Sequence, residues 1–254
     1  MVHTRRTRRR RTLVPAVLFA AGLTLLAACG SAAGDGREAS TASAAASPSR
    51  SAGSTDSKAS ADLLLAAEEG RPDAVREAIA GGADIEARDD RGRTPLLLAA
   101  TGDHDVAARI LVEAGADPDA QDDQDDSAWL VTGVTGSVKM ARVLIPAEPD
   151  YTLENRYGGT SLIPAGEHGH ADYVREVLKS TDMDVDHVND LGWTALLEAV
   201  ILGDGGKDHQ EVVELLLDGG ADPSLADGEG VTPLQHAEDK GQDEIAALLR
   251  AAGA

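Results

Sequence analysis

A phrase that recurs about every 33 residues constrains the fold of this 254-residue chain more than any other feature. The phrase begins with threonine or serine and runs into a short apolar stretch, at Thr94, Ser127, Thr160, Thr194 and Thr232. A fixed period of about 20 to 50 residues indicates a stack of similar units. Each unit is too small to bury its own apolar face, so the units must pack against one another.

A second apolar stripe follows each phrase with the spacing i, i+3, i+4, as at Val75, Ala78 and Ile79. This spacing places the three side chains on one face of a helix. Glycine then follows, as at Gly82 and Gly115, where a left-handed residue is suited to end a helix. Each unit is therefore predicted to contain two short helices and a connecting loop.

Phrase, stripe and glycine together resemble the ankyrin repeat, in which two antiparallel helices are followed by an outward-reaching hairpin loop. The resemblance covers residues 61–254 and implies an all-α solenoid of helix-turn-helix units with a concave face. Pro95 and Pro233 fall at the first helical position, where the missing N–H has no helical partner. We place the repeats at residues 61–93, 94–126, 127–159, 160–193, 194–231 and 232–254.

The chain departs from the ankyrin pattern in several repeats. The histidine that commonly follows Thr-Pro-Leu is absent, so we expect apolar contacts in place of its hydrogen bonds between neighbouring loops. Pro146 predicts a short second helix in the third repeat, and Pro164 falls in the first turn of its helix, where it is tolerated. Residues 203–208 lack the spacing of a phosphate-binding loop and are predicted to be a flexible loop between two helices.

Residues 1–28 have the order of an export signal: six arginines, an apolar stretch, and small residues before Cys29. The apolar stretch is shorter than a membrane span, and Pro15 interrupts it. Leu26 to Gly30 also resembles the bacterial lipobox, which implies cleavage before Cys29 and lipidation of that residue. With one cysteine, the chain forms no disulfide within itself.

The leader leaves the export route open, because Arg10 and Arg11 also look like a twin-arginine signal. Residues 29–60 are rich in alanine, serine and glycine and lack apolar periodicity, so they are predicted to be a disordered linker. The expected arrangement is an ankyrin domain outside the cytoplasm, anchored to the cell membrane through the lipid on Cys29.

The net charge of −21 restricts the class of partner. Loss of the six leader arginines would bring it to about −27. Such a field repels nucleic acid and anionic lipid headgroups and favours a basic protein partner or bound cations. We expect a monomeric solenoid without a cofactor.

No set of residues predicts catalysis, and we expect no enzyme activity. Residues 167–170, Glu-His-Gly-His, fall at the turn between two helices, where a structural role outweighs metal binding. Residues 117–126 form the most acidic stretch, and a Ca²⁺-binding acidic spacer at the cell surface is the alternative function. Turn-capping aspartates are the favoured interpretation of this stretch, and no metal ligand is assigned.

The leading hypothesis is protein binding through the hairpin tips and concave face, since family members commonly bind partners there. Tyrosine and tryptophan at the tips are suitable interface anchors. Trp193 could instead pack within its hairpin, and Trp129 takes the place of a core leucine. The candidate partner-binding residues are Asp122, Asp125, Arg156, Tyr157, Asp190 and Trp193.

Overall fold

The computed structural model describes residues 52–254, which form six pairs of antiparallel helices and contain no β-strand. This confirms the predicted all-α ankyrin-repeat fold. The helices are α1 (Ala52–Glu68), α2 (Pro72–Ala80), α3 (Pro95–Thr101), α4 (Asp105–Glu113), α5 (Leu130–Thr135), α6 (Val138–Leu144), α7 (Leu162–Glu167), α8 (Ala171–Ser180), α9 (Ala195–Ile201), α10 (Lys207–Asp218), α11 (Pro233–Lys240) and α12 (Asp243–Ala251). Between residues 52 and 254, no helix is both long and apolar enough to cross a membrane.

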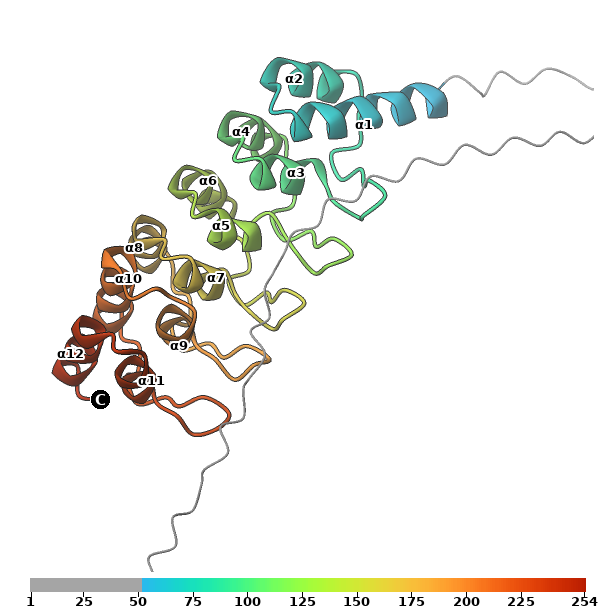
Figure 1. The fold of residues 1–254 in the computed structure, drawn as a ribbon. Coiled ribbons are helices and arrows are strands. Elements are labelled where there is room, and N and C mark those ends of the chain that lie inside the picture. Colours follow the sequence, from blue (N-terminus) through green and yellow to red (C-terminus); the bar gives the residue numbers. More distant parts are fainter. Residues whose placement is uncertain (1–51) are drawn as a thin grey trace, which may run out of the picture. The chain divides into compact units, whose positions relative to one another are not determined.

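The helices lie in two rows (Figure 1). The odd-numbered helices form what we call the inner row, beside the hairpin loops, and the even-numbered helices form the outer row. Five hairpins connect successive pairs, and we number them in chain order: residues 82–94, 115–127, 148–160, 182–194 and 220–232. Each helix packs on the corresponding helix of the next repeat, as a solenoid requires.

The ends of the helices follow the predicted sequence signals. Thr94 caps α3, its Oγ1 accepting a hydrogen bond from the Leu97 N–H at 3.2 Å, and Pro95 takes the next position. Thr232 and Gln235 form a capping box at α11. After α2, Gly82 adopts a φ of 85°, a conformation that suits glycine.

Aliphatic layers between the two rows form the core. Leu96, Trp129, Leu162 and Leu196 occupy equivalent positions of successive repeats, at or just before the start of an inner helix, and each is at most 1% exposed. The predicted burial of Trp129 is therefore confirmed, and its ring lies 5.1 Å from that of Tyr151. This layer is continuous from repeat to repeat.

Two glycines allow the middle inner helices to approach closely. A Cβ added to Gly133 of α5 would lie 1.8 Å from the Ser161 carbonyl oxygen. At the equivalent position of α7, a Cβ on Gly166 would lie 2.5 Å from the Ala195 oxygen. Neither distance is compatible with a side chain, so both positions require glycine.

The first helix begins earlier than the sequence indicated. Helix α1 starts at Ala52, so its first residues belong to the segment 29–60 that was expected to be linker. Lys58 and Asp62 form an ion pair one turn apart, and Ser60 Oγ accepts a hydrogen bond from the Asp84 N–H at 2.9 Å. Residues 1–51, including the predicted leader, Cys29 and most of the predicted linker, lie outside the described residues.

The third and fourth repeats confirm the predicted effects of proline. Helix α6 has seven residues and ends in a 3-10 turn over Ile145–Ala147 that contains Pro146. After it, Glu148 adopts a φ of 53° in place of glycine. Pro164 lies in the first turn of α7, as expected.

The insertion between α9 and α10 is fixed by other side chains. Lys240 Nζ donates to the carbonyl oxygens of Val200, Ile201 and Gly203 at 3.0, 2.5 and 3.0 Å. His209 Nδ1 lies 2.9 Å from Asp204 Oδ1 within the insertion. These contacts hold the segment that was predicted to be a flexible loop.

Candidate interaction surface

Each described hairpin connects the second helix of one repeat with the first helix of the next. The same side-chain arrangement closes all of these hairpins. The first tip residue, Asp or Asn, accepts hydrogen bonds on its Oδ1 from the backbone N–H groups two and four residues later. These residues are Asp89, Asp122, Asn155, Asn189 and Asp227. The five tips are therefore closed by the same backbone hydrogen bonds.

Neighbouring hairpins are joined by hydrogen bonds, which corrects the expectation that apolar contacts replace them. The backbone N–H of Asp190 donates to the Tyr157 carbonyl at 3.0 Å. Long polar side chains also cross from one hairpin to the next, because the repeat places each beside a carbonyl of its neighbour. The crossing bonds are Arg88 Nη1 to the Gln121 oxygen at 2.6 Å and Gln121 Nε2 to the Glu154 oxygen at 2.8 Å.

Asp122 and Asp125 of the second hairpin play different parts. Asp122 is half-buried and its carboxylate is used to close the turn. Asp125 is exposed and adopts a φ of 58°, at the tip position that is glycine in the other four hairpins. The second hairpin thus keeps a carboxylate in a conformation that favours glycine.

Arg156 and Tyr157 lie together on the third hairpin. The guanidinium of Arg156 lies 4.5 Å from the centre of the Tyr157 ring, and its Nη1 is 3.3 Å from Asp126 Oδ2. A hydrogen bond with Tyr157 raises the pKa of Arg156. The ring of Tyr157 is held in place and is 41% exposed.

Asp190 and Trp193 lie on the fourth hairpin, next to Tyr157. Asp190 is exposed, whereas Trp193 is half-buried and does not pack against the hydrophobic core. Two apolar side chains of the same hairpin, Val188 and Leu191, are 50% and 61% exposed and were not predicted as binding residues. Their position beside a tip, within a polar stretch, is the signal that could have identified them.

Charge is distributed unequally between the two rows. Every outer helix carries at least one lysine or arginine, and several of these pair with carboxylates, as Arg142 does with Glu176. Helices α3, α5, α7 and α9 contain no lysine or arginine. In the second to fifth hairpins, all of them described, Arg156 is the only such residue among many aspartates and glutamates. The second to fifth hairpins, beside inner helices that lack lysine and arginine from α3 to α9, therefore form a predominantly acidic surface.

Glu198 of α9 is a buried carboxyl group on this inner row, 5% exposed. Asn189 Nδ2 donates to Glu198 Oε1 at 2.9 Å. Burial, together with the charge of Glu167, raises the pKa of Glu198 to about 7, while the hydrogen bond from Asn189 opposes this shift. The position of this glutamate within the apolar run of residues 195–201 is the sequence signal that could have predicted its burial.

The histidines between paired helices have a structural role, as predicted for Glu167–His170. Nε2 of His170 lies 3.1 Å from the Val134 carbonyl oxygen of the preceding inner helix. His104 and His209 make the same contact with Glu68 and Glu167. Across residues 52–254 no three His, Cys, Asp or Glu side chains are placed to hold a metal ion.

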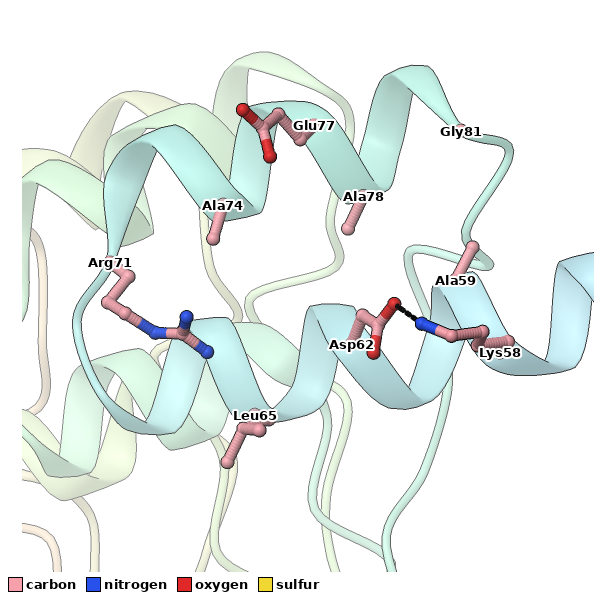
Figure 2. A pocket seen from close by; sticks show the side chains of 9 residues that line it. All are labelled: Lys58, Ala59, Asp62, Leu65, Arg71, Ala74, Glu77, Ala78 and Gly81. Carbon is pink, nitrogen blue, oxygen red and sulfur yellow. Dashed lines mark hydrogen bonds and ion pairs between the residues drawn. The ribbon is translucent and has the colours of Figure 1, made fainter.

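An open hollow lies between α1 and α2 (Figure 2). It has a volume of about 420 Å³ and is open to solvent. The small side chains of Ala74 and Ala78 point from α2 toward α1 and leave this space. Lys58 and Asp62 on its wall are paired with each other, so the hollow presents no set of acid, base and nucleophile.

Comparison with known proteins gives one family. The ankyrin repeat family matches residues 63–155, 134–227 and 184–254. An ankyrin repeat domain from Acinetobacter baumannii AYE is 45% identical with a TM-score of 0.72, covering 75% of this chain and 97% of its own. The ankyrin repeat protein EF0377 is 37% identical with the same coverage and TM-score.

A relative from Escherichia coli, YahD, named as an ankyrin repeat protein, is 50% identical over 105 residues. The match covers 41% of this chain and 52% of YahD, so the chain spans about half the length of that relative. The repeated phrase, the paired helices, the closed hairpins and these matches agree, and the chain belongs to the ankyrin-repeat family.

Proposed function

We propose that this protein binds a protein partner along its hairpins and inner row. We also propose that it lies outside the cytoplasm and that a lipid on Cys29 anchors it to the cell membrane. Ankyrin repeats serve protein–protein interaction, and their fold is a typical non-enzymatic scaffold. The observation that carries the proposed binding surface is the distribution of side chains. Exposed apolar tips occur on the third and fourth hairpins, and the second to fifth hairpins carry many carboxylates and one arginine, whereas the outer helices carry charges of both signs, some of them paired.

The candidate residues support this surface in two ways. Arg156, Tyr157, Asp190 and Trp193 belong to adjacent hairpins joined by the bond from Asp190 to Tyr157. Asp122 and Asp125 belong to the hairpin before them, which Arg156 reaches through Asp126. A partner could therefore contact all three hairpins at once, over side chains that lose little freedom on binding.

Site-specific photo-crosslinking in the producing organism tests the binding surface. A benzophenone amino acid is placed at Leu191 on a hairpin tip and, as a matched control, at Val106 on α4, which is 48% exposed. We expect a crosslinked protein of defined mass from position 191 and none from position 106. No product from position 191, or the same product from both positions, would contradict this surface.

The anchor has its own support and its own test. The order of arginines, apolar stretch, small residues and Cys29 is that of a lipoprotein leader. We expect the wild-type protein to take up radiolabelled palmitate and sediment with membranes, and the Cys29→Ser variant to do neither. A variant that keeps both label and membrane association would exclude Cys29 as the lipidated residue.

The acidic hairpins do not favour Ca²⁺ binding as a second function. The Asp122 carboxylate accepts two backbone hydrogen bonds, and Asp126 pairs with Arg156. These contacts occupy oxygen atoms that a calcium ion would need.

A further inference from the structure

Three of the seven exposed large apolar side chains of the described residues lie on two neighbouring hairpins. Tyr157, Val188 and Leu191 are 41%, 50% and 61% exposed, and we call them the apolar patch. Tyr157 and Leu191 occupy the same tip position in successive hairpins. The corresponding residues of the other hairpins are Arg91, Gln124 and Glu229, so the patch is confined to the middle of the row.

The backbone under the patch is rigid. The Asp190 N–H donates to the Tyr157 carbonyl at 3.0 Å, and His187 Nε2 lies 2.7 Å from the Gly158 oxygen. A Cβ on Gly158 would lie 2.8 Å from Asp190 Oδ1, which shows how closely the two hairpins approach. A partner that binds here meets a surface that is already ordered.

Carboxylates surround the apolar patch. Glu154 and Asp190 are exposed on the same two hairpins, and the acidic second and fifth hairpins flank them. The single arginine of this region, Arg156, is engaged by Asp126 and by the ring of Tyr157. The patch is therefore an apolar area within a negative field.

From this juxtaposition we propose that the apolar patch binds a polypeptide segment in which lysine or arginine residues flank a large apolar side chain. The apolar side chain contacts Tyr157 and Leu191, and the basic residues pair with Glu154 and Asp190. This proposal rests on the protein-binding function above and adds the chemistry of the partner. Complementary charge sets the specificity and speeds association, while the apolar contact supplies the anchor.

Selection from a phage-displayed library of random dodecapeptides against the full-length chain, at 150 mM salt, tests the proposal. We expect the enriched peptides to contain an excess of lysine and arginine around at least one large apolar residue. Fluorescence anisotropy then measures the affinity of one enriched peptide for variants of the chain.

The Tyr157→Ser, Leu191→Ser double variant should bind this peptide at least tenfold more weakly. The matched control is Val106→Ser, Leu202→Ser, which removes two apolar side chains that are each 48% exposed, one on outer helix α4 and one in the segment between α9 and α10, and should change affinity less than twofold. The Glu154→Gln, Asp190→Asn variant should weaken binding and reduce its dependence on salt. Circular dichroism of each variant checks that the helices remain.

Enriched peptides without basic excess, or equal affinity for the wild type and the patch variant, would overturn the proposal. Sedimentation showing that the chain associates with itself through Tyr157 and Leu191 would also overturn it, because the occupant would then be a second copy. A crosslinked partner from Leu191 combined with a failed selection would leave the proposed function standing and reject only the basic segment. Failure of both experiments would reject both.

Discussion

Asn189 donates its side-chain amide to the Glu198 carboxyl at 2.9 Å and so ties the base of the fourth hairpin to inner helix α9. The same Asn189 uses its Oδ1 to close that hairpin. The hairpin that presents Leu191 is thus tied to a buried acid whose pKa is raised to about 7.

Glu198 should make the domain less stable as the pH rises from about 5 to 8. Its folded pKa of about 7 exceeds the ordinary value of 4.5, so the folded state binds more protons than the unfolded state between these values. Glu198→Gln keeps an oxygen that can accept from Asn189 and removes the buried charge. We expect it to stabilise the domain at pH 8 by on the order of 2 kcal/mol, with little effect at pH 4.

Urea unfolding of the wild type and of Glu198→Gln at pH 4, 6 and 8 measures their difference in free energy of unfolding. This difference separates the titration of Glu198 from that of all other groups. Glu167→Gln is the control, because it removes the neighbouring charge without emptying the buried site. It should give a smaller change of the same sign. A wild-type minus variant difference that is constant with pH would contradict a raised pKa at Glu198.

Asp125→Gly should stabilise the second hairpin. Asp125 has a φ of 58°, and glycine accepts this conformation without strain. The hydrogen bond that the Gln121 side chain donates to the Asp125 carbonyl oxygen remains in the variant. We expect a gain of about 0.5–1 kcal/mol in the free energy of unfolding, measured with urea. Asp123→Gly is the control, because it removes the same charge from a neighbouring residue that has no positive φ. An equal gain in the free energy of unfolding for this variant would show that charge alone is responsible.

Gly133→Ala should be strongly destabilising. The added Cβ would lie 1.8 Å from the Ser161 oxygen, so α5 and α7 would have to separate. We expect the free energy of unfolding to fall by about 3 kcal/mol. Circular dichroism during thermal unfolding measures this loss. Gly228→Ala is the matched control, because nothing lies within 4 Å of its added Cβ. Equal melting temperatures for the two variants would disprove the close approach of α5 and α7.

Lys240→Met should loosen the segment between α9 and α10. Lys240 places its charge on three carbonyl oxygens at the end of α9, where a cation is favoured, and methionine retains only the stem. The expected loss is about 1 kcal/mol, with faster amide exchange around Gly203. Lys139→Met, at an exposed lysine of α6, should leave both quantities unchanged. Unaltered exchange in Lys240→Met would mean that the insertion is held by other contacts.

The sequence predicted what repeats in the structure, because period and phase report the same local environment several times. Thr94, Pro95 and Gly82 signal helix ends through local backbone chemistry, and Trp129 is buried because it takes a leucine position. The start of α1 was missed because alanine and serine permit both a linker and a helix, and contacts such as Ser60 with Asp84 decide between them.

The candidate surface was less predictable because it depends on differences between repeats. The placement of Arg156 and Tyr157 beside Asp190 follows from the period of the repeats. The exposure of Leu191 and the burial of Glu198 do not, because each depends on how a neighbouring hairpin or helix covers one side chain. Contacts across 30 or more residues, such as Arg156 with Asp126, likewise appear only in the folded chain.

Hydrogen exchange of the full-length chain, with and without the selected basic peptide, tests the binding surface most directly. We expect slower amide exchange in the third and fourth hairpins, residues 148–160 and 182–194, and unchanged exchange in the outer helices α4 and α6. Protection confined to the outer helices, with the peptide fully bound, would contradict it.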